Sequence, residues 1–127
     1  MSKRHPHKPL EGDNIPAVKQ WLTANGFLWL RIPNTRVSIS QGKLRHVPID
    51  PNQVGAPDLV AWENDYRLEM LAGPPAFSMC YAIEVKAWNG VQSYGQIEWE
   101  KKAKRYGIKY IVVRSVEELQ EKINAAY

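Results

Sequence analysis

The stretch Tyr81-Ala82-Ile83-Glu84-Val85-Lys86 decides both the fold and the candidate chemistry of this chain. It is rich in β-branched, aromatic and apolar residues, and it predicts a β-strand over residues 79–87. Side chains alternate between the two faces of a strand, so Glu84 and Lys86 share one face. Tyr81, Ile83 and Val85 share the other. The strand therefore presents a carboxylate and an amine on one side and a core-forming apolar row on the other.

A second apolar stretch, 58–62, follows the punctuating residues Gly55-Ala56-Pro57 and predicts another strand. If Asp58 opens a neighbouring strand, its carboxylate meets Glu84 and Lys86 at one end of the sheet. Carboxylate oxygens suit Mg²⁺ or Mn²⁺, and a lysine beside the metal can position or help deprotonate a water. These groups are suited to hydrolysing a phosphodiester. The alternative is a solvated Glu-x-Lys face beside an ordinary Pro-Asp turn.

The composition of the chain limits the number of domains, the kind of partner and the cellular compartment that we expect. A chain of 127 residues is long enough for one domain with one core. The net charge of +4 is compatible with a polyanionic partner. Cys80 is the single cysteine, so no internal disulfide forms, and a buried thiol in a reducing cytoplasm is expected. No apolar run approaches the roughly 20 residues that span a bilayer, so we expect no membrane association.

In the N-terminal half, a helix is predicted over 14–25, with Asp13 or Asn14 as its cap and Pro16 in its first turn. A strand follows over 27–32. Residues 35–54 are interpreted as a long basic loop with room for a short hairpin around Gln41-Gly42. Residues 63–78 form a second insertion.

In the C-terminal half, Ser93-x-x-Gln96 matches a capping box and opens a helix that runs to about Arg105. A strand is predicted over 109–114, and Ser115-x-x-Glu118 opens a final helix with Leu119 and Ile123 inward. The order αβββαβα predicts an α/β fold with helices around a mixed sheet. The domain is expected to span 10–127, after a flexible basic tail at 1–9.

Four segments together resemble a known family: Gly55-x-Pro57-Asp58, Ile83-Glu84-Val85-Lys86, Gln96-x-x-Trp99, and 107–115 with its Val112-Val113-Arg114 core. They are similar to the VRR-NUC branch of the PD-(D/E)xK nucleases, in the small stand-alone form found in phages and bacteria. The resemblance covers about 11–119. It implies a restriction-endonuclease-like fold and Mg²⁺-dependent phosphodiester cleavage.

The resemblance also implies roles for individual residues. Asp58, Glu84 and the Val85 carbonyl correspond to metal ligands, and Lys86 corresponds to the catalytic lysine. Gln96 corresponds to a further polar residue of the family's site, although its capping role explains it equally well. Glu11 matches an acidic residue that opens the family's first helix and can reach the metal.

The same resemblance predicts a DNA substrate. Basic residues would contact the backbone without reading bases: Arg36, Lys43, Arg45, Lys101, Lys104, Arg105 and Arg114. A solvated surface, or for Arg114 an ordinary strand end, is the alternative. The expected function is a structure-selective endonuclease similar to Holliday-junction resolvases. It would act as a homodimer in the cytoplasm, that of a bacterial host if phage-encoded. The alternatives are a nuclease subunit that works with a helicase or packaging partner, and a non-cleaving nucleic-acid-binding module.

Overall fold

The computed structural model describes residues 10–33, 35–48, 54–63 and 79–125. Their elements, in chain order, are α1 (Glu11–Ala24), β1 (Leu28–Arg31), β2 (Thr35–Ser40), β3 (Lys43–Pro48), β4 (Leu59–Trp62), β5 (Cys80–Val85), α3 (Tyr94–Arg105), β6 (Lys109–Val113) and α4 (Val116–Asn124). The predicted tail at 1–9 and nearly all of the predicted insertion at 63–78 lie outside the described residues.

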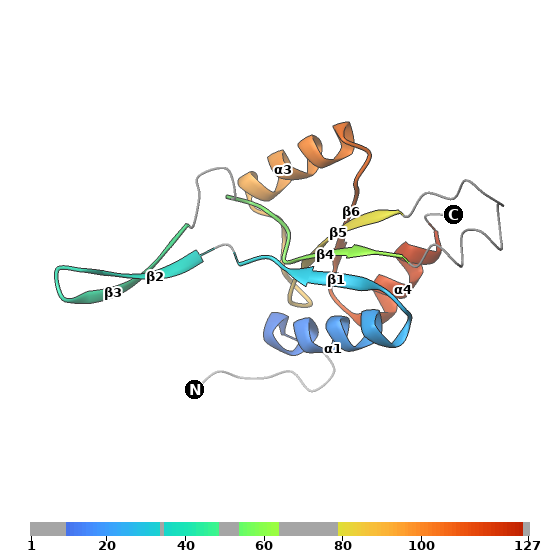
Figure 1. The fold of residues 1–127 in the computed structure, drawn as a ribbon, viewed down its shortest axis with the longest axis horizontal. Helices are drawn as coiled ribbons and strands as arrows, with labels where there is room; N and C mark the ends of the chain where they lie inside the picture. The colour runs from blue at the N-terminus through green and yellow to red at the C-terminus, as the bar shows by residue number, and fades with distance from the viewer. Residues whose placement is uncertain (1–9, 34, 49–53, 64–78, 126–127) are drawn as a thin grey trace.

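Four strands form the main sheet in the order β1-β4-β5-β6. The pairs β1–β4 and β4–β5 are antiparallel, whereas β5 and β6 are parallel and are joined through α3. Helices α1 and α4 lie against one face of the sheet and α3 lies against the other (Figure 1). The chain is therefore a mixed α/β protein, as the sequence predicts. The described part of it contains no helix long and apolar enough to cross a membrane.

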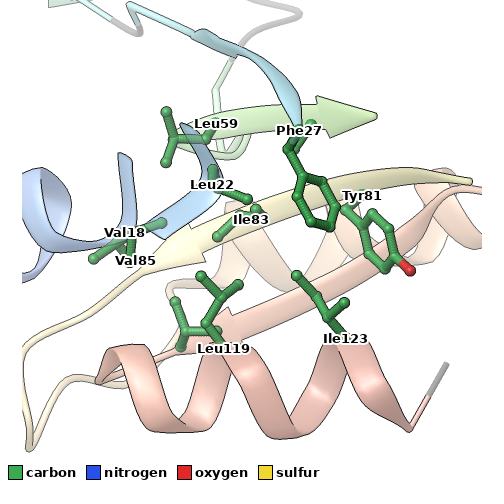
Figure 2. Packing of buried hydrophobic residues seen from close by; sticks show 11 residues of the cluster. Val18, Leu22, Phe27, Leu59, Tyr81, Ile83, Val85, Leu119 and Ile123 are labelled. Carbon is green, nitrogen blue, oxygen red and sulfur yellow. The ribbon is translucent and has the colours of Figure 1, made fainter. Parts of the chain in front are cut away.

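Strand β5 has the two faces that its sequence predicts. Tyr81, Ile83 and Val85 are fully buried and point toward α1 and α4 (Figure 2). Ala82 faces the other way and packs in a second cluster with Ala103 of α3 and Tyr110 of β6. Burying each large apolar side chain stabilises the fold by about 1.5–3 kcal/mol. The main core includes Val18, Leu22, Phe27, Leu59, Val113, Leu119 and Ile123.

Helix α1 begins three residues earlier than predicted, with Leu10 rather than Asp13 or Asn14 at the N-cap. Asp13 instead accepts a hydrogen bond from the backbone N–H of Leu10, at 3.4 Å. Pro16 consequently lies in the second turn of the helix rather than the first. The early start makes Glu11 the first helical residue.

Asn14 is buried, and it ties α1 to the sheet instead of capping the helix. Its side-chain amide donates to the carbonyl oxygens of Lys86, at 2.9 Å, and Arg114, at 2.8 Å. These carbonyls lie directly beyond the ends of β5 and β6. Asparagine favours helix N-caps, but Asn14 instead donates to these two carbonyl groups, which would otherwise need other hydrogen-bond partners.

Residues 35–48 form a regular hairpin, whereas the sequence predicts a long loop with room for a short hairpin around Gln41-Gly42; the turn lies at that position, and the strands extend over the whole segment. β2 and β3 pair antiparallel, with Ile39 opposite Leu44 and Ser40 opposite Lys43. At the turn, Gln41 and Gly42 have φ values of 53° and 72°. Positive φ at both central positions is the geometry of the type I′ turn, which matches the twist of two antiparallel strands. The predicted order αβββαβα therefore lacked this pair of strands.

The C-terminal half follows its prediction closely. Ser93 and Gln96 form the complete capping box at the start of α3. At the start of α4, Ser115 accepts a hydrogen bond from the N–H of Glu118, while the Glu118 side chain pairs with Lys122.

Cys80 is only partly buried, and its burial raises the pKa of the thiol.

Candidate functional site

The two acidic residues meet where β4 begins and β5 ends. Leu59 pairs with Ile83, so Asp58, one residue earlier, lies beside Glu84. The Asp58 Oδ2 atom accepts a hydrogen bond of 2.7 Å from the backbone N–H of Val85. Both carboxylates are buried, with Asp58 6% and Glu84 3% exposed. The antiparallel register thus places two acidic groups side by side at the edge of the core.

A close backbone approach positions the loop that carries Asp58. Gly55 has a φ of 83°, and a Cβ atom there would collide with the carbonyl group of Gly95 in α3. Only glycine meets both requirements at low cost. The Gly55-Ala56-Pro57 segment can therefore lie directly on the first turn of α3, which carries Gln96.

Gln96 joins the helix cap to the acidic pair. Its Oε1 atom accepts from the N–H of Ser93, at 2.8 Å, and from Lys86 Nζ, at 2.7 Å. Its Nε2 atom donates to Glu84 Oε1, at 2.7 Å. The capping role and the location beside Glu84 and Lys86 are thus both present in one side chain. We call Asp58, Glu84, Lys86 and Gln96 the carboxylate–lysine cluster.

Lys86 completes this cluster from just beyond the end of β5. Its Nζ atom lies 3.7 Å from Glu84 Oε1, and its side chain is mostly buried. Its backbone N–H donates to the carbonyl of Val113 at 2.9 Å, which continues the parallel β5–β6 ladder. Strand pairing restricts the backbone of Lys86, and the hydrogen bond to Gln96 restricts its side-chain amine. The amine is therefore held close to the two carboxylates.

Arg31 is a neighbour of the cluster that the sequence analysis missed. It ends β1, and its guanidinium lies 3.2 Å from Asp58 Oδ1. The N–H of Ile32 also donates to the Asp58 carbonyl, at 2.8 Å. No local pattern signals this contact, because it depends on β1 pairing with β4 across more than twenty residues of chain.

The electrostatics of the cluster are dominated by burial of charge. Burial and, to a smaller extent, the nearby Asp58 carboxylate raise the pKa of Glu84 against the opposing effect of Lys86, and the net value is about 8. Glu11 is a minor contributor in the same direction. Glu84 Oε2 is buried and accepts no hydrogen bond from any described residue. A cation beside this oxygen would supply the missing partner and favour the charged carboxylate.

The donor set fits a hard divalent cation. No group of three or more His, Cys, Asp or Glu side chains gathers among the described residues. Mg²⁺ is usually bound through one or two carboxylates and retains several waters, so Asp58 and Glu84 are sufficient. Val85, whose backbone carbonyl is the further metal ligand that the resemblance implies, directly follows Glu84 in the chain. Glu11 is exposed at the start of α1 and affects the cluster only through its charge.

The predicted basic residues are not gathered at the cluster. Arg114 donates to the Gly90 carbonyl, at 2.8 and 3.0 Å, and pairs with Glu118, so it stabilises a turn. On α3, Lys101 and Lys104 pair with acidic neighbours, and Arg105 is exposed. In the hairpin, Lys43 and Arg45 are exposed, and the Arg36 side chain lies outside what is described.

Comparison of the chain with protein-family models, with curated proteins and with solved structures gives no match.

Replacing Glu84 with glutamine should stabilise the metal-free protein at alkaline pH. The pKa of Glu84 is about 8 in the folded protein, against an ordinary value of 4.5. Between these values the unfolded chain releases a proton that the folded protein retains, so stability is lost as pH rises toward 8. Glutamine has no proton to lose. Thermal melts in EDTA should give Glu84→Gln a higher Tm than the wild type at pH 8, by several degrees, and little difference at pH 4.5.

The matched control is Glu121→Gln, which removes one exposed carboxylate from α4 beyond the first turn of the helix. Its Tm should follow that of the wild type at both pH values. If Glu84→Gln also follows the wild type, burial does not suppress the ionisation of this carboxyl.

Proposed function

We propose that this protein is a metal-dependent DNA endonuclease of the VRR-NUC type with a restriction-endonuclease-like fold. The observation that carries the proposal is the carboxylate–lysine cluster itself. Two buried carboxylates lie side by side at one end of the sheet, and Gln96 links Glu84 to Lys86 through bonds of 2.7 Å. Arg31 and Lys86 each lie near one of these carboxylates, yet the pKa of Glu84 is still raised to about 8, so the two side-chain cations compensate the buried charge only in part. A functional site is a stronger reason for this arrangement than stability is.

Asp58 and Glu84 would hold Mg²⁺ or Mn²⁺, with the Val85 carbonyl as a further ligand. When bound, such an ion lowers the pKa of a coordinated water and offsets charge on the scissile phosphate. The buried Glu84 Oε2 atom, which lacks a hydrogen-bond partner among the described residues, supports this assignment. The hydrogen bond from the Val85 N–H fixes the Asp58 carboxylate in place before any ligand arrives.

Lys86 would act on the reacting groups directly. Its amine has three donors, of which Gln96 occupies one at 2.7 Å. A further donor can orient the attacking water or contact a phosphate oxygen, where it stabilises developing negative charge. Gln96 acts as a positioning residue. It restricts both Glu84 and Lys86, and it is itself restricted by the Ser93 cap.

DNA would be held through its backbone and selected by shape. The chain carries a net charge of +4, and exposed basic residues occur on β3 and α3. We propose a homodimer, which presents two sites to two strands of a branched molecule. Leu28 and Leu30 are exposed on β1, the edge strand of the four-stranded sheet, and they offer apolar surface for a second copy.

The direct test is cleavage by the full chain. Supercoiled, linear, flapped and four-way-junction DNA are incubated with Mg²⁺, Mn²⁺ or EDTA, and the mass in solution is measured by light scattering. We expect a dimer that cuts branched DNA faster than linear duplex with either metal and cuts nothing in EDTA. A monomer that cuts all shapes at equal rates would refute the dimer and the shape preference. Equal binding in Mg²⁺ and EDTA without any cleavage would identify a non-cleaving module instead.

A further inference from the structure

The β2–β3 hairpin is an arm that begins at the carboxylate–lysine cluster and projects away from the body. It forms a separate two-stranded sheet, and Figure 1 shows it extending beyond the main sheet. Its first strand starts just after Ile32, whose N–H donates to the Asp58 carbonyl. Strands of six residues reach about 20 Å at about 3.3 Å per residue. The tip is therefore about 20 Å from the base of the arm, so a ligand that contacts both the tip and the cluster must extend over that distance, as duplex DNA does.

The tip of the arm has two chemically different faces. Ile39 and Leu44 are directly paired across the strands, so both project to the same face, and they are 74% and 73% exposed. Lys43 and Arg45 flank Leu44 on β3 and project to the opposite face, where both are exposed. Two large apolar side chains exposed together at a tip provide apolar surface that a partner can cover.

Charge favours a polyanion as that partner. Residues 35–48 contain Arg36, Lys43 and Arg45 and no Asp or Glu, so this segment contributes +3 to a chain whose net charge is +4. The arm and the chain as a whole are both positively charged, so DNA is a more favourable partner for the arm than a second copy is.

We propose that the hairpin is a DNA-probing arm whose tip pair, Ile39 and Leu44, inserts between bases at an unstacked step while Lys43 and Arg45 contact phosphates. Apolar side chains of DNA-bending proteins act as such wedges, and the energetic cost is that of separating stacked bases. That cost is lowest where stacking is already interrupted, as at a branch point. The inference rests on the proposed function, and it explains the proposed preference for branched DNA by two side chains, Ile39 and Leu44.

The test compares two double variants of the full chain in EDTA, where cleavage does not interfere. Ile39→Thr with Leu44→Thr removes the wedge and keeps strand propensity and both cations. Lys43→Gln with Arg45→Gln removes the cations and keeps the wedge. The probes are a four-way junction with 2-aminopurine at the branch point and a linear duplex of the same sequence. Anisotropy gives the affinity, and 2-aminopurine fluorescence reports unstacking.

With the wild type, we expect fluorescence at the branch point to rise severalfold and the junction to bind about tenfold more tightly than the duplex. The threonine pair should lose both effects and bind the duplex within about twofold of the wild type. The glutamine pair should weaken binding to both DNAs. It should also reduce the slope of log affinity against log salt by about 2, since two cations are lost.

Several results would overturn the arm proposal. One is a threonine pair that keeps the fluorescence rise and the junction preference. Another is a threonine pair that changes the mass in solution, which would make the arm a contact between copies. Circular dichroism melts should be unchanged, because the tip is exposed.

The arm proposal and the nuclease proposal can fail separately. If the wild type cuts branched DNA and the threonine pair keeps the preference for the junction, the proposed role of the arm is wrong and the proposed nuclease activity is retained. If branch-point unstacking depends on the pair but no metal supports cleavage, the nuclease fails and the arm stands.

Discussion

Replacing Lys86 with alanine should reduce the rate of DNA cleavage by about 10²–10⁴-fold and leave DNA affinity within about threefold of the wild type. Removing one preorganised donor from a reacting centre has an effect of this size. Lys86 is one of 17 lysine and arginine residues, so the loss of its charge has little effect on backbone binding. Single-turnover cleavage of a four-way junction in Mg²⁺ measures the first quantity, and anisotropy in EDTA measures the second.

The matched control is Lys102→Ala, which removes the same charge from an exposed position on α3. Its cleavage rate should remain within about twofold of the wild type. The Lys86 variant should stay folded, because Gln96 keeps its bond to the Ser93 N–H and Asn14 keeps its bond to the Lys86 backbone. A parallel loss of binding and cleavage would make Lys86 a phosphate-contacting residue rather than a catalytic one.

Replacing Asp58 with asparagine should abolish metal-supported cleavage and weaken Mn²⁺ binding at least about tenfold. Asparagine keeps the shape of the side chain and an acceptor for the Val85 N–H, but it removes one of the two carboxylate charges that the cluster offers to a divalent cation. The loss of charge also removes the ion pair with Arg31. Calorimetric titration with Mn²⁺ measures the affinity, and junction cleavage measures the activity.

Glu121→Gln is the control, since it neutralises one exposed carboxylate on α4 and should leave Mn²⁺ affinity unchanged. Ca²⁺ should bind the wild type without supporting fast cleavage, because it tolerates looser coordination and acidifies water less well. A wild type that does not bind Mn²⁺ would count against the metal site. So would equal Mn²⁺ affinity in the wild type and the Asp58 variant.

Local patterns in the sequence were sufficient to predict the elements that carry the cluster. The alternation of Glu84 and Lys86 with Tyr81, Ile83 and Val85 gives β5 its two faces, because strand geometry has a period of two residues. The Ser93–Gln96 capping box is also local, since its partners lie within one helical turn. Turn and cap signals likewise predicted α3, β6 and α4.

The predictions failed where a residue's local preference competed with distant partners. Asn14 looks like a helix cap, but two carbonyls more than seventy residues away along the chain hold it inside the fold. Residues 35–48 have loop-like composition, and the short hairpin that the sequence allowed around Gln41-Gly42 extends over the whole segment through continuous cross-strand pairing. The partners of Asn14 are not visible in a short window of sequence, whereas every cross-strand partner of the hairpin lies within residues 35–48.

The sequence by itself determined which residues could form strands and helices, and it placed Glu84 and Lys86 on one face of β5. These outcomes depend on backbone sterics and on hydrogen bonds between near neighbours. Only the tertiary structure decided that Asp58 lies beside Glu84, that Arg31 reaches Asp58, and that Gly55 rests on Gly95. Those contacts depend on strand order and register, which are set by burial of the whole sheet between α1, α4 and α3 and by no single segment.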